Sequence, residues 1–270
     1  MPELPEVETI ARGVHERLRG DRIESTWFSG KPEPFKSSPS LMAKKLPRHR
    51  IDRVYRVGKH IVFDLEDFQW IVHLGMTGRL LVAEPETPVP MHTHGILYLA
   101  SGRELRFVDP RRFGRLQLHG PISHKTSAFA GTGREPLNIS KDDFAALFRN
   151  RRTSIKAALL NQKLLQGVGN IYADESLFRA AIRPRRMASR LKRAELDRLH
   201  HALQSVLRDA ISLGGSSVSD YVDAAGAEGF FQLEHRVYLR TGQPCLVCTT
   251  PIRRLVLGGR GTHYCPRCQR

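Results

Sequence analysis

The sequence predicts an α+β protein built from an N-terminal β domain with a leading helix, a helical domain and a four-cysteine zinc hairpin. Short apolar-alternating runs fill residues 22–120. Helical periodicity begins at about residue 140, and all four cysteines lie in the last 26 of 270 residues. We expect these parts to span residues 1–125, 126–138 (a linker), 139–235 and 236–270.

The first helix begins within MPELPEVETI. Apolar residues recur at helical spacing from Leu4 to Leu18, and Gly20 can end the helix. Proline followed by acidic residues is an ordinary helix N-terminus. Removal of the start methionine would instead leave Pro2 as a secondary amine beside the Glu3 carboxylic acid. These ten residues alone favour the helix start over a nucleophile and an acid.

The β domain is predicted from four runs separated by Gly or Ser-Gly turns: IDRVYRVGKHIVFDL, QWIVHLGMTGRLLVAE, HGILYLASGRELRFVD and FGRLQLHG. Their regular spacing favours a sandwich or a flattened barrel. We expect a polar loop at residues 30–40.

The helical domain is predicted to hold four helices. Ser140 is placed to cap the first, with Asp143 positioned for a capping box. The expected ranges are 140–148, 153–161, 170 to before Pro184, and a long helix from Ser189 that stops at Gly214. The Gly/Ser-rich stretch 214–229 then leads to the cysteines.

The charge predicts a polyanion partner. The formal net charge is +16 and the pI is about 10.3, as expected for a nucleic-acid binder, although a ribosomal or merely basic protein has the same composition. We see no secretory signal and no apolar run of membrane length, so we expect a cytoplasmic or nucleoid-associated protein.

The cysteines read C-x2-C, sixteen residues, C-x2-C. This spacing favours one tetrahedral zinc ion over two disulfides, and four thiolates close the site, so the metal is expected to be structural. The expected ligands are Cys245, Cys248, Cys265 and Cys268. Zinc would supply the folding energy that so short a segment lacks.

Several turns could contact DNA. QGVGNIYADES suits a phosphate at a helix N-terminus, although a tight interhelical turn is equally consistent. DPRRFG and HLGMTGRL could each place an apolar wedge in a base stack, although a basic hairpin and core packing explain them locally. Arg260, between the cysteine pairs, could reach a phosphate, and Lys59 begins a strand beside Gly58.

Taken together, MPELPEVET, VGKH, HLGMTGRL, DPRRFG, GVGNIYADESLF and the cysteine tail resemble the bacterial formamidopyrimidine-DNA glycosylase family, in order and across essentially the whole chain. The resemblance implies a β-sandwich, a helix-two-turn-helix domain and a zinc hairpin. It also implies a monomer that binds damaged double-stranded DNA, with one structural zinc and no redox or catalytic cofactor. Leu4 and DPRRFG favour this branch over endonuclease VIII.

The resemblance also implies residue roles. Pro2 matches the Schiff-base nucleophile, Glu3 the acid, Lys59 the lysine assigned to β-elimination, and Arg260 the arginine associated with δ-elimination. Three residues match the triad that fills the gap left by the everted nucleotide: Met76, Arg111 and Phe113. The further expected DNA contacts are His73, His92, Arg152, Asn170 and Tyr172.

Three places depart from the family pattern. His263 stands where an aromatic residue is common, and Arg134 where proline is frequent. The loop 216–230, expected to cover the extruded base, has its own sequence, so the match alone does not fix lesion preference. We therefore expect a bifunctional glycosylase and abasic-site lyase for oxidised purines, with an oxidised-pyrimidine enzyme or a non-catalytic DNA-binding homologue as alternatives.

Overall fold

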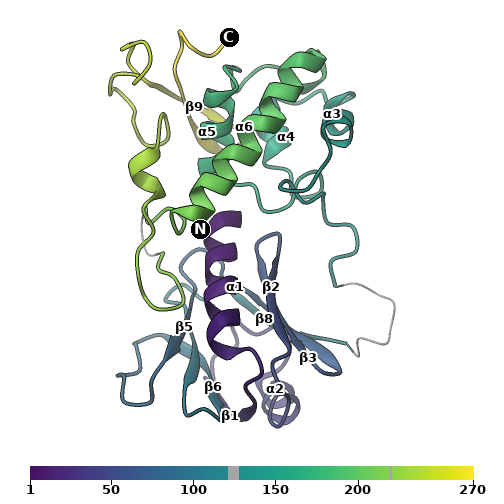
Figure 1. Ribbon diagram of the computed structural model, residues 1–270, viewed down its shortest axis with the longest axis vertical. Helices are drawn as coiled ribbons and strands as arrows, with labels where there is room; N and C mark the ends of the chain where they lie inside the picture. The colour runs from purple at the N-terminus through teal and green to yellow at the C-terminus, as the bar shows by residue number, and fades with distance from the viewer. Residues whose placement is uncertain (121–127, 219–220) are drawn as a thin grey trace. The chain divides into compact units, whose positions relative to one another are not determined.

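The computed structural model describes residues 1–120, 128–218 and 221–270, and it divides into two compact units (Figure 1). The first unit comprises residues 1–130 and 213–230, and the second comprises 131–212 and 231–270. Within the described residues, no helix is both long and apolar enough to span a membrane.

The first unit is a two-sheet β-sandwich, which confirms the predicted fold. One sheet has the strand order β1-β6-β7-β5 and the other β2-β3-β4-β8, and all neighbours within each sheet are antiparallel. The strands are β1 (Ile23–Phe28), β2 (Arg53–Val57), β3 (His60–Leu65), β4 (Phe68–His73), β5 (Arg79–Ala83), β6 (Thr93–Leu99), β7 (Glu104–Val108) and β8 (Arg115–His119).

Helix α1 (Leu4–Leu18) packs against strands of both sheets, namely β2, β3 and β5 (Figure 1). Its apolar stripe is buried in the same core as Phe63, Trp70 and Phe107. Burial of each such side chain contributes about 1.5–3 kcal/mol relative to exposure. The core therefore fixes the start of α1, and with it the N-terminal residues, on the sandwich.

Helix α2 (Pro39–Lys45) begins inside the stretch that we expected to be a polar loop. Ser38 caps it, because its Oγ accepts a hydrogen bond from the Leu41 amide at 3.2 Å. Met42 is fully buried in the core of the first unit. The single apolar anchor in a polar segment explains why periodicity did not reveal this helix.

The segment 213–230 groups with the first unit, whereas the sequence-based division assigned it to the helical domain. Tyr221 and Ala224 are buried in the sandwich core, and the Val82 amide donates to the Ala224 carbonyl oxygen at 2.9 Å. These contacts explain the difference, because a Gly/Ser-rich sequence carries no periodicity that reports its partner.

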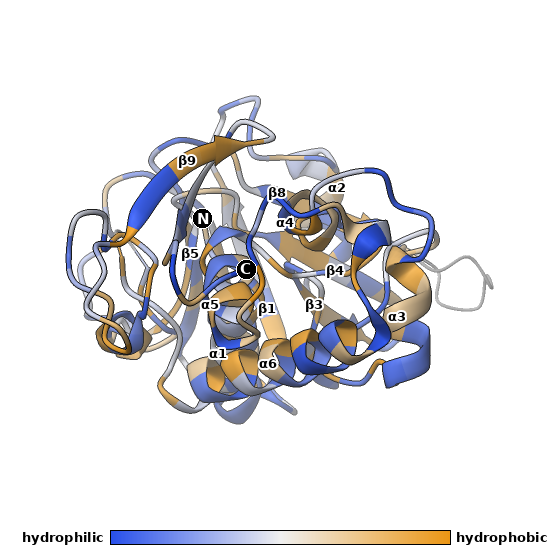
Figure 2. Ribbon diagram, turned by 90° about the horizontal axis from the view of Figure 1, so that it is seen from above, coloured by the Kyte–Doolittle hydropathy of each residue, from blue (hydrophilic) through white to orange (hydrophobic). Residues whose placement is uncertain are grey.

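The second unit contains the predicted helices and the zinc hairpin. They are α3 (Lys141–Phe148), α4 (Ile155–Leu159), α5 (Asn170–Arg179), η1 (Ala188–Arg190), α6 (Arg193–Ser212), η2 (Phe231–Glu234), β9 (Arg253–Leu257) and β10 (Arg260–Tyr264). Ser140 caps α3 as predicted, since its Oγ accepts from the Asp143 amide at 3.1 Å. Figure 2 shows β9 beginning with hydrophilic residues and ending with hydrophobic ones.

The long helix α6 begins at Arg193, so the predicted start at Ser189 was wrong. Ser189 lies in the short helix η1, and Leu191 has extended backbone angles. The Glu195 carboxylate accepts from the Lys192 amide at 2.8 Å and pairs with Arg186. Glu195 therefore satisfies a free amide at the first turn and sets the start of the helix.

Candidate active site and metal centre

The N-terminus is held at the head of α1. Pro2 is buried and Glu3 is 4% exposed. Glu3 occupies the N-cap position in a reciprocal capping box with Glu6, whose Oε2 accepts from the Glu3 amide at 2.8 Å. The other Glu6 oxygen accepts from the Ser216 amide at 2.8 Å. Glu6, which the sequence reading did not single out, thus links the helix head to the loop predicted to cover the base.

Lys59 lies in the two-residue turn between β2 and β3. Gly58 has a φ of 59°, which the primed turns of tight hairpins require. Arg56 ties this turn to α1, because it donates to the Gly58 carbonyl at 3.2 Å and pairs with Glu8 at 2.8 Å. Glu8 is five residues along α1 from Glu3, or ~7.5 Å along the helix axis. The first unit therefore holds Pro2, Glu3 and the Lys59 turn on one framework.

The predicted wedge residues extend from two turns of the first unit. Met76 is 42% exposed and Phe113 is 47% exposed, both high values for large apolar side chains. The Arg111 guanidinium lies 4.8 Å from the centroid of the Phe113 ring. Gly75, with a φ of 63°, packs so closely that a Cβ there would lie 2.5 Å from the Phe113 carbonyl carbon. The two turns are therefore in direct contact.

Asp109 organises both turns, and the sequence reading missed this role. It is fully buried, and its Oδ1 accepts from the Thr77 hydroxyl at 2.6 Å while its Oδ2 accepts from the Gly114 amide at 2.8 Å. The Arg111 amide also approaches its Oδ1 at 3.3 Å. The Asp-Pro sequence signalled a turn, but the partner Thr77 is 32 residues away and no local pattern indicated it.

The two histidines predicted to contact DNA differ in environment. His92 is exposed and its carbonyl accepts from the Asp109 amide at 3.0 Å, so it flanks the Asp109 turn. His73 is half-buried and its ring lies 4.9 Å from that of His60. Burial, followed by the charges of His60, Lys59 and Arg115, lowers the pKa of His73 to about 4. His73 is therefore neutral at physiological pH.

Arg260 opens strand β10 after the turn Gly258-Gly259, and its side chain is exposed. The next residue is anchored, since the Gly261 carbonyl accepts from Asn170 Nδ2 at 2.9 Å and from Lys156 Nζ at 3.0 Å. Asn170 is the first residue of α5, and Gly169 occupies the N-cap position. Asn170 thus joins the helix start to the hairpin that carries Arg260.

A buried charged cluster supports the same hairpin. Lys156 and Asp174 are both fully buried and their charged atoms lie 2.6 Å apart. Asp174 Oδ2 accepts from the His263 amide at 2.8 Å and lies 3.2 Å from its Nδ1. The ring of His263, the residue that we expected to depart from the family pattern, therefore hydrogen-bonds the central carboxylate of this cluster.

The two remaining residues predicted to contact DNA, Arg152 and Tyr172, differ in solvent exposure. Arg152 is exposed in the connection between α3 and α4. Tyr172 is fully buried and its ring lies 5.6 Å from that of Phe231. The Tyr172 ring therefore packs into the core of the second unit, and a DNA contact at this position stays a prediction.

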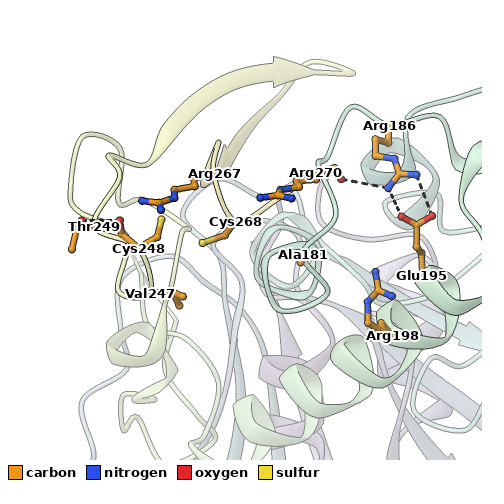
Figure 3. Close-up of a pocket in the computed structure, with 10 residues that line it drawn as sticks. All are labelled: Ala181, Arg186, Glu195, Arg198, Val247, Cys248, Thr249, Arg267, Cys268 and Arg270. Atoms are coloured by element: carbon orange, nitrogen blue, oxygen red, sulfur yellow. Dashed lines mark hydrogen bonds and ion pairs between the residues drawn. The ribbon is translucent and has the colours of Figure 1, made fainter.

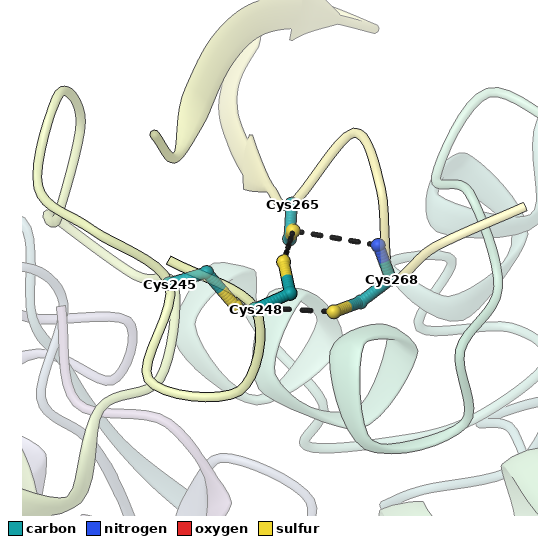
Figure 4. A group of neighbouring side chains, drawn as sticks. All are labelled: Cys245, Cys248, Cys265 and Cys268. Atoms are coloured by element: carbon teal, nitrogen blue, oxygen red, sulfur yellow. Dashed lines mark hydrogen bonds between the residues drawn. The ribbon is translucent and has the colours of Figure 1, made fainter. Parts of the chain in front are cut away.

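The four cysteines come together at the end of the hairpin (Figure 4). All four sulfurs lie within 4.8 Å of one another, and the closest pairs are Cys248–Cys265 at 3.4 Å and Cys245–Cys268 at 3.9 Å. Tetrahedral zinc with bonds of about 2.3 Å places its sulfurs ~3.8 Å apart, so this set fits the ion. All four positions are protein ligands, and the zinc is structural.

Comparison with known proteins agrees with these sites. The chain matches the formamidopyrimidine-DNA glycosylase N-terminal domain over residues 1–116, the H2TH domain of the same enzymes over 132–222, and a zinc finger found in FPG and IleRS over 242–270. Formamidopyrimidine-DNA glycosylases of Solibacter usitatus and Thioalkalivibrio sulfidiphilus are 46% and 44% identical, each with full coverage of both chains.

Solved structures of formamidopyrimidine-DNA glycosylases are also similar to this chain. The Lactococcus lactis FPG mutant G226P in complex with Fapy-dG-containing DNA superposes with a TM-score of 0.93 at 34% identity, covering all of both chains. A MutM complex with carbocyclic 8-oxo-G-containing DNA gives a TM-score of 0.91 at 34% identity, again with full coverage. The chain belongs to the formamidopyrimidine-DNA glycosylase family.

Proposed function

We propose that this protein is a bifunctional DNA glycosylase and abasic-site lyase of base excision repair, which removes oxidised purines such as 8-oxoguanine and formamidopyrimidines. The observation that carries this proposal is the head of α1, where Glu6 holds Glu3 directly after the buried Pro2, in the same unit as the Lys59 turn. Relatives have been solved with Fapy-dG-containing and 8-oxo-G-containing DNA.

The Pro2 amine is suited to covalent catalysis once Met1 is removed. An α-amino group titrates at about 7.7–8.0, so a neutral fraction exists at physiological pH. Its nitrogen attacks the anomeric carbon of the sugar, the bond to the base breaks, and ring opening gives an iminium ion. A secondary amine makes that iminium positively charged without an added proton.

The iminium then acts as the electron sink for strand cleavage. It acidifies the adjacent sugar carbon, so loss of a proton there expels the 3′ phosphate, and a second elimination expels the 5′ phosphate. In this scheme Glu3 donates a proton during base loss and ring opening, Lys59 serves the first elimination, and Arg260 binds phosphate for the second. Hydrolysis of the imine restores the free amine of Pro2.

The exposed residues of the Asp109-centred turns fit base eversion. An enzyme that acts on a base must take it out of the stack, and an apolar wedge fills the gap left behind. We assign this role to Met76 and Phe113, with Arg111 replacing lost hydrogen bonds to the orphaned base. His92, Arg152 and Asn170 are assigned to the DNA backbone. The enzyme acts on damaged duplex DNA as a single chain, and we place it at the nucleoid in the cytoplasm.

A direct comparison of substrates tests the lesion class. Excision is measured under single-turnover conditions on matched duplexes carrying 8-oxoguanine opposite cytosine or thymine glycol opposite adenine. We expect the purine lesion to react at least tenfold faster. A Lactococcus lactis FPG complex with oxidised-pyrimidine-containing DNA makes the second arm necessary. Preference for thymine glycol would overturn the purine assignment, and tight binding without cleavage of either duplex would indicate a non-catalytic homologue.

A further inference from the structure

A basic pocket of about 790 Å³ lies beside the four-cysteine metal centre of the second unit, and Cys248 and Cys268 form part of its lining (Figure 3). Its charged lining consists of Arg186, Arg198, Arg267, Arg270 and Glu195. These residues come from three places: the turn after α5, the first turns of α6 and the residues after β10. None of them belongs to the set that we assign to DNA chemistry, so the pocket needs a separate explanation.

Among the described residues, Arg186 is the one of these four arginines that forms a direct ion pair, and Arg198 acts on the same Glu195 carboxylate only through its charge. Arg186 donates to both Glu195 oxygens, at 2.5 Å and 3.1 Å. Arg198, Arg267 and Arg270 are exposed, and none makes an ion pair with any residue in the described ranges. Arg267 adjoins Cys268 in sequence and lines the pocket with Cys248, so it lies beside the metal ligands. Arg198 and Arg270 remain available for an external anion.

The pocket is separated along α5 and β10 from two of the residues assigned to DNA, Asn170 and Arg260. Asn170 begins α5, whereas Ala181, which lines the pocket, follows its C-terminus. The ten residues of α5 span ~15 Å. Likewise Arg260 begins β10 and Cys268 follows its other end, and five residues of strand span ~17 Å. A backbone phosphate held at Arg260 or Asn170 is therefore not the anion that fills this pocket.

The other surfaces of the pocket favour a peptide over a nucleic acid. Val247 lines it and is 70% exposed, and its neighbour Leu246 is 58% exposed. No aromatic side chain is present among the described residues that line the pocket, so it has no platform for base stacking. Guanidinium groups bind carboxylates in a bidentate manner, and arginine beside exposed aliphatic side chains is typical of protein interfaces.

We propose that this pocket is a docking site for an acidic peptide segment of a partner protein, with its carboxylates on Arg198 and Arg270 and an aliphatic side chain against Val247. This proposal is independent of the proposed enzymatic function, because it uses none of the same residues. It gives the enzyme a means of being brought to its substrate by another protein while its DNA-binding residues stay free.

The test measures binding of a fluorescein-labelled decapeptide to the full-length zinc-loaded protein by fluorescence anisotropy. The peptide contains six aspartates and two leucines. The variant is Arg198→Glu, chosen because no cysteine is near it in sequence. The matched control is Arg208→Glu, the same charge change almost three turns along the same helix and outside the pocket. Zinc content and affinity for an abasic-site duplex are measured for each protein.

We expect Arg198→Glu to raise the peptide Kd at least tenfold, Arg208→Glu to change it less than twofold, and neither to alter zinc content. A peptide with asparagine in place of aspartate, and one with serine in place of leucine, should each bind at least fivefold more weakly. Equal effects of the two charge reversals would overturn the proposal, as would no detectable peptide binding. Competition by duplex DNA, with equal loss of DNA affinity in Arg198→Glu, would assign the pocket to nucleic acid instead.

Discussion

The buried pair of Lys156 and Asp174 gives the sharpest prediction about stability. Both side chains are fully buried, with 2.6 Å between their charged atoms. Asp174→Ala would leave the lysine charge buried without its carboxylate, which costs about 3–5 kcal/mol. It would also remove the acceptor of the His263 amide, at about 1–3 kcal/mol for an unsatisfied buried donor. We therefore expect a loss of about 4 kcal/mol or more in the free energy of unfolding of the second unit.

A double-mutant cycle separates this pair from ordinary packing. The variants are Asp174→Ala, Lys156→Met and the two combined, each followed by urea unfolding and by zinc release to a chromogenic chelator. Because the double variant buries no unpaired charge, we expect its loss to be at least 2 kcal/mol smaller than the sum of the single losses. Single losses below 1 kcal/mol, or additive losses, would refute the view that this pair holds the hairpin.

Three further predictions concern the turns, a histidine and the metal. Gly75→Ala should cost about 2 kcal/mol or more and weaken binding to abasic-site DNA, because the new Cβ would meet Phe113 backbone at a positive φ. Gly102→Ala, also at positive φ but with nothing within 4 Å, should cost less and leave DNA binding unchanged. The pKa of His73 is about 4 in the native state and about 6.5 in the unfolded state, so the unfolded state binds more protons between these values. The free energy of unfolding should therefore fall by up to ~3 kcal/mol as the pH is lowered from 6.5 to about 4. His73→Gln should remove this part of the pH dependence in thermal unfolding scans. Zinc removal by chelation, or Cys268→Ser, should reduce strand cutting and duplex affinity together, and an unaffected nicking rate would contradict a structural role for the hairpin.

The features that the sequence predicted well are those with local patterns. Strand alternation, the Ser140 cap and the cysteine spacing each depend on neighbours in the chain, and the structure agrees with all three. Resemblance added the residue roles, since no periodicity identifies Pro2 as a nucleophile. Those roles stay predictions that only biochemical measurement can test.

The features that escaped prediction depend on distant partners. Asp109 accepts hydrogen bonds from residues of two separate turns, and Glu6 links α1 to residue 216. The prediction that α6 starts at Ser189 was wrong because the apolar periodicity extends beyond the helix, whereas the Glu195 carboxylate caps the Lys192 amide and sets the start at Arg193. The burial of the Tyr172 ring was also not predictable, because a motif position does not report which way a side chain points.

The proposed chemistry depends on the amine of Pro2, and borohydride trapping tests this amine most directly. Protein shown by mass spectrometry to lack Met1 is incubated with a duplex carrying 8-oxoguanine opposite cytosine in the presence of sodium borohydride. An otherwise identical protein with a one-residue N-terminal extension is the matched control. We predict a covalent protein–DNA adduct only for the processed protein, with duplex affinity within threefold for both. No adduct from the processed protein, or equal adduct from the extended one, would contradict the assignment of Pro2 as the nucleophile.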